Sequence, residues 1–181
     1  MTYTAVGRGG ITIGYMNTRD WKHFDERQVL MPPTNKDCTL FPRRIHGRYY
    51  LLHRPSTCCD IGGNNMWMAS SEDLRGWHDH RLIAMPRPGM WDGSRVGAGA
   101  APIETPEGWL EIYHGATEQH RYCFGAMLFD LDDPYRLIAR SATPIMEPEA
   151  EYELHGFMND CIFTNGHVID GDRIRMYYGA A

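Results

Sequence analysis

Two side chains that can bind an anion stand directly after strongly β-forming runs. Arg54 follows YYLLH, and His114 follows WLEIY. Each also follows a turn glycine at a similar interval, since Arg54 comes seven residues after Gly47 and His114 comes six residues after Gly108. A guanidinium can grip an oxyanion through two parallel hydrogen bonds, and an imidazole titrates near neutral pH. The repeated placement predicts that both side chains lie at corresponding ends of corresponding strands.

Three more donors occupy comparable places. Lys36 precedes the strand-like run CTLF, Arg95 lies in the glycine-rich stretch WDGSRVGAGA, and Tyr122 follows the loop ATEQHR. If these strand ends meet, the five side chains line one site that suits a small anion such as phosphate. Each also has an ordinary alternative: a salt-bridged arginine, a loop charge, a structural histidine or a packed tyrosine.

Four further residues are candidates for contact with a substrate. Asp37 stands beside Lys36, ahead of the same strand. Trp91 and Asp92 combine an aromatic platform with a hydrogen-bond acceptor, as a sugar site does, although a buried turn would use the same pair. Glu153, in EYELHG, would either bond a sugar hydroxyl or cap a turn.

The sequence predicts neither a metal nor an organic cofactor. His78 and His80 form an HxH pair, but no third ligand accompanies them. The stretch VGAGA lacks the GxGxxG spacing and the preceding strand of a dinucleotide site.

The elements that must position these residues have the pattern of short β-hairpins. CTLFPRRIHGRYYLLHR reverses at His46 and Gly47, APIETPEGWLEIYHG at residues 106–108, and CIFTNGHVIDGDRIRMYYG at residues 170–172. Turn residues between β-branched and aromatic runs are typical of hairpins. Because amphipathic helical periodicity is scarce, we expect an all-β fold.

A second repeat supports this fold. ITIGYMNTRDWKHF and NMWMASSEDLRGWH share an apolar strand, then Ser/Thr-x-Asp, an apolar residue and a later aromatic, at positions 53 residues apart. A third, more divergent copy surrounds Asp132. Side chains at this spacing bond the backbone of a turn. These aspartates are therefore predicted to be structural rather than catalytic.

The repeats predict propeller blades. The turn glycines Gly47, Gly108 and Gly171 lie 61 and 63 residues apart. Units of roughly 55 to 60 residues with about four short strands are typical of a β-propeller. The chain holds about three such units and starts and stops within one. We expect one partial propeller domain over residues 1–181, truncated at both ends.

The composition argues against several classes of protein. A formal net charge of −5, from 18 basic and 23 acidic residues, disfavours nucleic-acid binding through bulk charge. No apolar run approaches the roughly 18 to 20 residues that span a bilayer, and the first residues lack the pattern of a signal peptide. Five cysteines without a CxxC spacing predict reduced thiols. We expect a cytoplasmic protein that binds neither nucleic acid nor membrane.

Four long stretches resemble one known family. NKDCTLFPRRIHGRYYLLHRP, MWMASSEDLRGW, WDGSRVGAGAAPIETPEGWLEIYHG and LDDPYRLIARSATPIMEPEAEYELHG look like glycoside hydrolase family 130, the mannooligosaccharide and mannosyl-sugar phosphorylases, and the resemblance runs from Tyr3 to Ala181. It implies a five-bladed β-propeller. It also implies inverting phosphorolysis of a β-mannoside oligosaccharide, which yields α-mannose 1-phosphate and a shortened sugar.

The resemblance also implies roles for the predicted site. Inversion needs a general acid on the leaving oxygen and a nucleophile on the opposite face of the sugar. When inorganic phosphate is that nucleophile and co-substrate, the enzyme needs a cationic site to hold it rather than a base to activate water. Arg54 and His114 then resemble phosphate-site residues, with Lys36, Arg95 and Tyr122 as further members. A β-mannoside hydrolase on the same fold and a non-catalytic sugar-binding propeller fragment stay open as alternatives.

Two family features are expected outside this chain. The general-acid Asp belongs to an EDPR-like motif upstream of Met1, and an Asp that contacts the sugar follows YYGAA. No catalytic residue is therefore predicted within the chain, and we expect it to be inactive, or nearly so, by itself. The acceptor sugar and a homo-oligomeric full-length form are left open.

Overall fold

Nearly all regular structure in the protein is β-strand. The computed structural model describes residues 1–56 and 63–181, in which fourteen strands accompany one short helix, α1 (Glu151–Leu154). The all-β prediction is therefore confirmed. Within the described ranges, no helix is long and apolar enough to cross a membrane. Cys38, Cys123 and Cys161 are free thiols, and the other two cysteines of the sequence, Cys58 and Cys59, lie outside these ranges.

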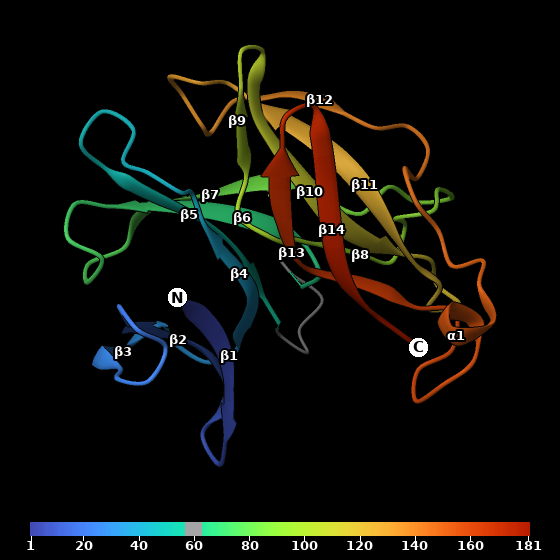
Figure 1. Ribbon diagram of the computed structural model, residues 1–181, viewed down its shortest axis with the longest axis horizontal. Helices are drawn as coiled ribbons and strands as arrows, with labels where there is room; N and C mark the ends of the chain where they lie inside the picture. The colour runs from blue at the N-terminus through green and yellow to red at the C-terminus, as the bar shows by residue number, and fades with distance from the viewer. Residues whose placement is uncertain (57–62) are drawn as a thin grey trace.

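The strands form four antiparallel sheets (Figure 1). Sheet 1 has the order β1 (Thr2–Gly7), β2 (Gly10–Asn17), β3 (Asp25–Met31). Sheet 2 has the order β4 (Asn35–Leu40), β5 (Tyr49–Pro55), β6 (Met66–Ser71), β7 (His78–Ala84). Sheet 3 has the order β12 (Leu137–Arg140), β11 (Tyr122–Phe129), β10 (Gly108–Ala116), β8 (Arg95–Gly97), and β9 (Ile103–Thr105) also pairs with β10. Sheet 4 contains β13 (Ile162–Asp170) and β14 (Arg173–Ala180).

The three predicted hairpins are confirmed. β4 and β5 are joined through His46 and Gly47, whose φ angles are 48° and 80°. β9 and β10 reverse at residues 106–107, and β13 and β14 pair up to Asp170 and Arg173, beside Gly171 at φ 58°. Positive φ angles match the twist of tight hairpins and suit glycine.

The repeated Ser/Thr-x-Asp turns have the predicted structural role. Thr18 and Asp20 accept backbone N–H groups of residues 20–23, and Ser71 and Asp73 accept those of residues 73–76. In the third copy Asp130 accepts the N–H groups of residues 132 and 133, and Asp133 accepts that of Tyr135, whereas Asp132, around which this copy is predicted, accepts no backbone N–H among the described residues. Each accepting carboxylate is thus occupied by its own turn, as such local motifs require.

Two apolar cores join consecutive sheets. The larger core lies between sheets 2 and 3, where Phe41 meets Trp109 edge to face at 5.4 Å between ring centroids. The smaller core lies between sheets 1 and 2 and includes Ile13 and Leu51. Because successive side chains of a strand face opposite ways, Leu51 enters the smaller core and Leu52 the larger one. β5 is therefore buried on both faces, and it carries Arg54 into the interior.

The sheets approach one another along their first strands. Residues of β1, β4 and β13, with Ala98 and Gly99 beyond the end of β8, line one cavity of about 180 Å³. Figure 1 shows sheet 2 between sheet 1, in blue, and sheet 3, in yellow and orange. The described strands do not close into a ring, so the number of blades stays a prediction.

The centre of β10 carries a carboxyl group that the sequence analysis did not single out. Glu111 is fully buried, and its Oε1 accepts the Gly99 N–H at 2.7 Å. Its Oε2 has no partner among the described residues. Burial raises the pKa of Glu111 to about 8, although the hydrogen bond from Gly99 opposes the rise. The folded protein therefore holds this carboxyl in its neutral form at pH 7.

This burial predicts a specific pH dependence of stability. The pKa of Glu111 is raised above the ordinary value of 4.5 to about 8, so the unfolded chain loses this proton first as the pH rises. The contribution is complete below pH 4.5 and is lost by about pH 8. As the pH rises from 5 to 8, the free energy of unfolding of the parent protein should fall relative to that of Glu111→Gln, by roughly 1 to 4 kcal/mol. Urea unfolding at both values measures the difference. Glu107→Gln, at an exposed turn, is the matched control, and equal pH dependence in the parent and Glu111→Gln would contradict the account.

Candidate anion-binding site

The pairing of β4 with β5 places Lys36 directly opposite Arg54. Directly opposed residues of an antiparallel pair share one face, so the two side chains emerge together. Arg54 is only 3% exposed, and its Nη2 lies 2.6 Å from Oδ2 of Asp37, which is also nearly buried. Asp37 adopts φ 51° at the irregularity in β4, a conformation that Asp tolerates better than most residues.

β10 brings His114 to the same carboxylate. His114 is fully buried, and its Nδ1–H donates to the Ala98 carbonyl at 3.1 Å because a carbonyl oxygen can only accept. Its Nε2 lies 3.3 Å from Asp37 Oδ2, while the ring packs on Phe163 at 4.4 Å between centroids. Burial lowers the pKa of His114, and the neighbouring carboxylate of Asp37 opposes this.

Gly97 makes the approach of these two side chains feasible. It is paired with His114 across β8 and β10. A Cβ at this position would lie 2.5 Å from His114 Cε1 and 2.6 Å from Asp37 Oδ2, which is closer than side chains can pack. The glycine is therefore required by the contact between β4 and β10 rather than by its own backbone conformation.

Arg95 and Tyr122 complete the group. The Arg95 Nη1–H donates to the Tyr122 hydroxyl at 2.8 Å, and its guanidinium lies 5.6 Å from the centroid of that ring. His120, beside Tyr122, contacts Arg95 Nη2 at 3.2 Å. The charges of Arg95 and Asp37 both act on Arg54. The structure thus brings together the five residues predicted to bind an anion, and Asp37 with them. We call this set the Arg54 cluster: Lys36, Asp37, Arg54, Arg95, His114 and Tyr122.

The charges of the Arg54 cluster are unbalanced in favour of an anion. Three cationic side chains face one carboxylate. Burial would raise the pKa of Asp37, but the hydrogen bond and charge of His114, followed by the charges of Arg54 and Lys36, outweigh it and lower the pKa to about 2. Burial, with the charges of Arg54 and Arg95, lowers the pKa of Lys36. An added anion would offset this mutual repulsion.

Several buried N–H groups of the cluster have no partner. Within the described ranges these are Nε and Nη1 of Arg54 and Nε of Arg95, and Oδ2 of Asp37 and Nε2 of His114 also lack a well-aligned hydrogen-bond partner. Burying guanidinium N–H groups without hydrogen-bond acceptors costs free energy. The oxygen atoms of an oxyanion can accept hydrogen bonds from these groups. The arrangement can therefore hold a small oxyanion. The same residues offer a divalent cation one carboxylate and repulsion from three positive charges, and no group of three or more potential ligands occurs in the described chain.

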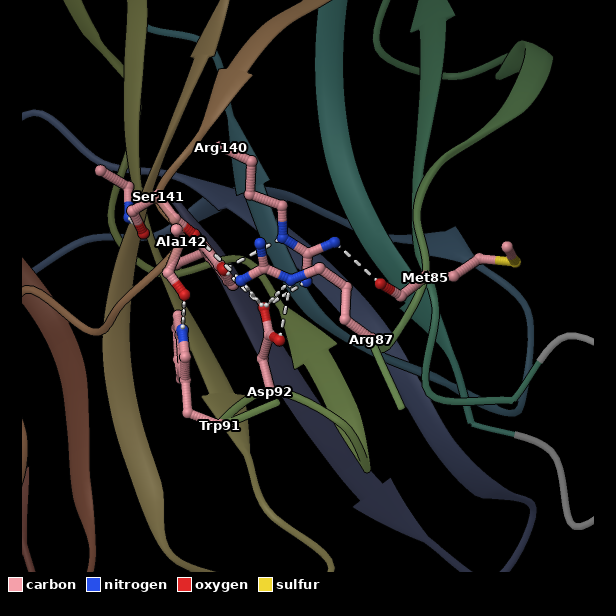
Figure 2. Close-up of polar contacts among 9 residues, drawn as sticks. Met85, Arg87, Trp91, Asp92, Arg140, Ser141 and Ala142 are labelled. Atoms are coloured by element: carbon pink, nitrogen blue, oxygen red, sulfur yellow. Dashed lines mark hydrogen bonds and ion pairs between the residues drawn. The ribbon is translucent and has the colours of Figure 1, made fainter. Parts of the chain in front are cut away.

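Asp92 lies in a buried ion-pair group, apart from the Arg54 cluster. Figure 2 shows the guanidinium groups of both Arg87 and Arg140 in contact with its carboxylate. Arg87 Nη2 donates at 2.7 Å and the Tyr113 hydroxyl at 2.8 Å, and Asp92 itself is fully buried. The hydrogen bonds of Arg87 and Tyr113 outweigh burial and lower its pKa. This is the buried-turn alternative, in which the carboxylate fastens β12 to the loop before β8.

Trp91 is held next to this ion-pair group. Its Nε1–H donates to the Ala142 carbonyl at 3.1 Å (Figure 2). Its ring covers Gly115 and Gly125, where an added Cβ would lie 2.7 Å and 2.6 Å from ring atoms. The ring also lines a surface cavity of about 400 Å³ together with Thr117. Neither Trp91 nor Asp92 contacts the Arg54 cluster, and a sugar platform at Trp91 stays a prediction.

Glu153 caps a turn in the structure. Its Oε2 accepts the N–H groups of Glu149 and Ala150 at 2.8 and 2.9 Å, and Tyr178 donates to its Oε1 at 2.6 Å. These backbone hydrogen bonds, followed by that of Tyr178, lower the pKa of Glu153. Of its two predicted roles, the geometry favours the structural one.

No sequence pattern selects Gly97, His120 or Phe163 as parts of the site. Gly97 lies in the run VGAGA, whose small residues are a weak sign that another segment approaches closely. His120 reaches Arg95 only because the loop before β11 lies beside it, and Phe163 reaches His114 only because β13 packs against β10. No local sequence pattern encodes either contact.

Comparison with known proteins gives this cluster a context. Residues 1–181 match the family described as β-1,4-mannooligosaccharide phosphorylase, glycoside hydrolase family 130. Over its whole length the chain is 46% identical to a β-1,2-mannobiose phosphorylase of Listeria innocua, and the match covers 51% of that protein. Over 94% of its length it is 36% identical to a β-1,4-mannooligosaccharide phosphorylase of Ruminococcus albus, and the match covers 52% of that protein. It thus spans about half the length of the relatives it matches.

A solved structure agrees. The Listeria innocua β-1,2-mannobiose phosphorylase in complex with β-1,2-mannobiose superposes with a TM-score of 0.95 at 46% identity, over 99% of this chain and 50% of that one. The resemblance noted from four sequence stretches therefore extends to every part of the chain. On this evidence the chain belongs to glycoside hydrolase family 130.

Proposed function

We propose that the chain provides the phosphate-binding part of an enzyme that cleaves β-mannosides by phosphorolysis. The observation that carries this proposal is the buried guanidinium of Arg54, whose Nε and Nη1 have no partner in the described chain. The relatives named above are phosphorylases of β-mannosides, which supports phosphate as the anion. Inorganic phosphate is then a co-substrate, and we assign no further cofactor.

The proposed task of the Arg54 cluster is to hold phosphate in line with the anomeric carbon. Asp37 holds Nη2 of the Arg54 guanidinium, so Nε–H and Nη1–H keep fixed directions and can donate to ligand oxygen atoms without a search among rotamers. Lys36 and Arg95 add charge to a site with little water, where it acts strongly. Attack of a phosphate oxygen on the β-mannoside inverts the anomeric centre and yields α-mannose 1-phosphate. We assign the general acid to no residue of this chain.

The finer features of the fold belong to the same proposal. We take the four sheets as part of a five-bladed β-propeller, with β1, β4, β8 and β13 nearest its axis. The cavity that these strands line supports that arrangement. A single partial propeller domain over residues 1–181, in a cytoplasmic protein, is the corresponding proposal for the whole chain.

Replacement of Arg54 tests the phosphate site. Loss of two charge-assisted hydrogen bonds, each worth about 1.5 to 3 kcal/mol, should weaken phosphate binding at least 100-fold in Arg54→Ala. Isothermal titration calorimetry with inorganic phosphate measures the affinity. Arg54→Lys keeps a cation beside Asp37 but not the fork, so we expect near-normal thermal stability with weakened phosphate binding.

The matched control for Arg54 is Arg43→Ala, because Arg43 is half exposed and is paired with Glu104 at the surface. Phosphate affinity should be unchanged in this variant. Tight phosphate binding by a folded Arg54→Lys protein would contradict the proposal. Phosphate-independent release of mannose from a β-mannoside would instead favour the hydrolase alternative, and sugar binding without turnover would favour the non-catalytic one.

Gly97→Ala tests the geometry without removing a charge. The added methyl group would occupy space held by His114 and Asp37, so both side chains must shift. We expect phosphate affinity to fall at least tenfold and the melting temperature to fall by several degrees, since overpacking costs about 1 to 3 kcal/mol. Gly166→Ala, where nothing lies within 4 Å of the added Cβ, is the control. Phosphate affinity in Gly97→Ala equal to that of the parent would show that the contact is not needed.

A further inference from the structure

A second cavity lies on the other face of β5, between sheets 1 and 2. It has a volume of about 380 Å³, and β3, β5, β6 and β7 all contribute to its walls. His53 lines it, whereas the next residue, Arg54, faces the Arg54 cluster. Successive side chains of a strand point to opposite faces, so the two sites share a strand and no lining residue. Cavities of this size are typical of small-molecule sites.

The polar groups on one wall of the cavity form a continuous chain of hydrogen bonds, which runs from the Trp77 carbonyl through His80 and His53 to Asn35. His80 Nε2 lies 3.2 Å from the Trp77 carbonyl, which can only accept, so this nitrogen carries the proton. His80 Nδ1 then accepts from His53 Nε2–H at 3.3 Å, and His53 Nδ1 accepts from Asn35 Nδ2–H at 3.0 Å. Burial lowers the pKa of His53 to about 3, so this imidazole is neutral near pH 7, as the arrangement requires.

Two indole N–H groups are left over. Trp67 lies opposite His53 in the pairing of β5 with β6, and Trp77 lies just before β7. Both rings line the cavity, and the Nε1 atoms of both are buried without a partner in the described chain. The indoles of Trp91 and Trp109, in contrast, donate to backbone carbonyls. A buried indole normally finds an acceptor, so an unmatched pair on one cavity wall indicates a ligand that supplies acceptors.

The chemistry of the walls restricts that ligand. None of the lining residues in the described chain is Asp, Glu, Lys or Arg, and His53 is neutral, so the cavity offers no carboxylate, ammonium or guanidinium to hold an ion. The remaining walls are apolar, from Leu30, Met31, Pro32 and Pro55. A fitting ligand therefore has apolar faces for the rings and hydroxyl oxygens at its edge for the two indole N–H groups. A neutral pyranose combines these features in one ring.

We propose that this cavity is a second binding site, separate from the Arg54 cluster, which takes one neutral hexopyranose unit between Trp67 and Trp77. The indole N–H groups donate to ring hydroxyls, and the apolar walls cover the C–H faces of the sugar. This inference does not rest on the proposed function, because it uses no residue of the Arg54 cluster.

The indole resonances test the proposal directly. The protein, labelled with ¹⁵N in its tryptophans, is titrated with the methyl pyranosides of mannose, glucose and N-acetylglucosamine. At least one sugar should shift the indole N–H signals of Trp67 and Trp77 in a saturable way. The signals of Trp91 and Trp109, which have backbone partners, and of exposed Trp21 should not move. Inorganic phosphate should leave the Trp67 and Trp77 signals unchanged.

Variants without the N–H group provide the second measurement. Trp67→Phe and Trp77→Phe should each weaken sugar binding about fivefold, the effect of one lost hydrogen bond, while Trp21→Phe should not. If either variant fails to fold, the titration of the unaltered protein decides. The proposal is overturned if no sugar moves the two signals, if phosphate or an apolar aromatic such as toluene moves them instead, or if folded variants bind sugar with unchanged affinity.

Discussion

The buried ion pair of Arg54 with Asp37 is the interaction on which the site depends. A guanidinium that is 3% exposed is stable in the interior only if a carboxylate and further acceptors compensate for the lost water. Asp37 pairs with Nη2 of this guanidinium, and Gly97 lets His114 approach the same carboxylate. Nε–H and Nη1–H of Arg54 stay without a partner in the described chain, so the need for an anion follows from how this strand is buried.

Neighbouring carboxylates show how the environment decides the role of a residue type. Asp92 is buried like Asp37, but two arginines and a tyrosine hydroxyl occupy it fully, and it fastens structure together. Glu111 meets no cation among the described residues and stays protonated, with a pKa of about 8. At Asp37 three positive charges meet one carboxylate, and two donor nitrogens of Arg54 are left without a partner in the described chain. The capacity to bind an anion comes from that local excess, in a chain whose net charge is −5.

Much of this arrangement could be predicted from the sequence. The hairpin turns, the Ser/Thr-x-Asp turns and the all-β class are encoded locally, and similar offsets from turn glycines, seven and six residues, predicted that Arg54 and His114 lie at corresponding strand ends. Turn capping by Glu153 is one of its two predicted roles, whereas the ion pairs of Asp92 could not be predicted because its partner Arg140 lies 48 residues away. The same holds for Gly97, whose importance depends on the approach of β4 to β10. Contacts between sheets, rather than local patterns, decided each of these cases.

The most direct test observes the unpartnered Nε–H group of Arg54. In protein labelled with ¹⁵N in its arginines, the Arg54 Nε–H resonance should shift downfield and become protected from solvent exchange when inorganic phosphate is added, because that N–H then donates to an oxyanion. The surface guanidinium of Arg43 should respond only to ionic strength. If saturating phosphate changes neither the chemical shift nor the solvent exchange of Arg54 Nε–H in the folded protein, the claim that this buried arginine binds the anion is contradicted.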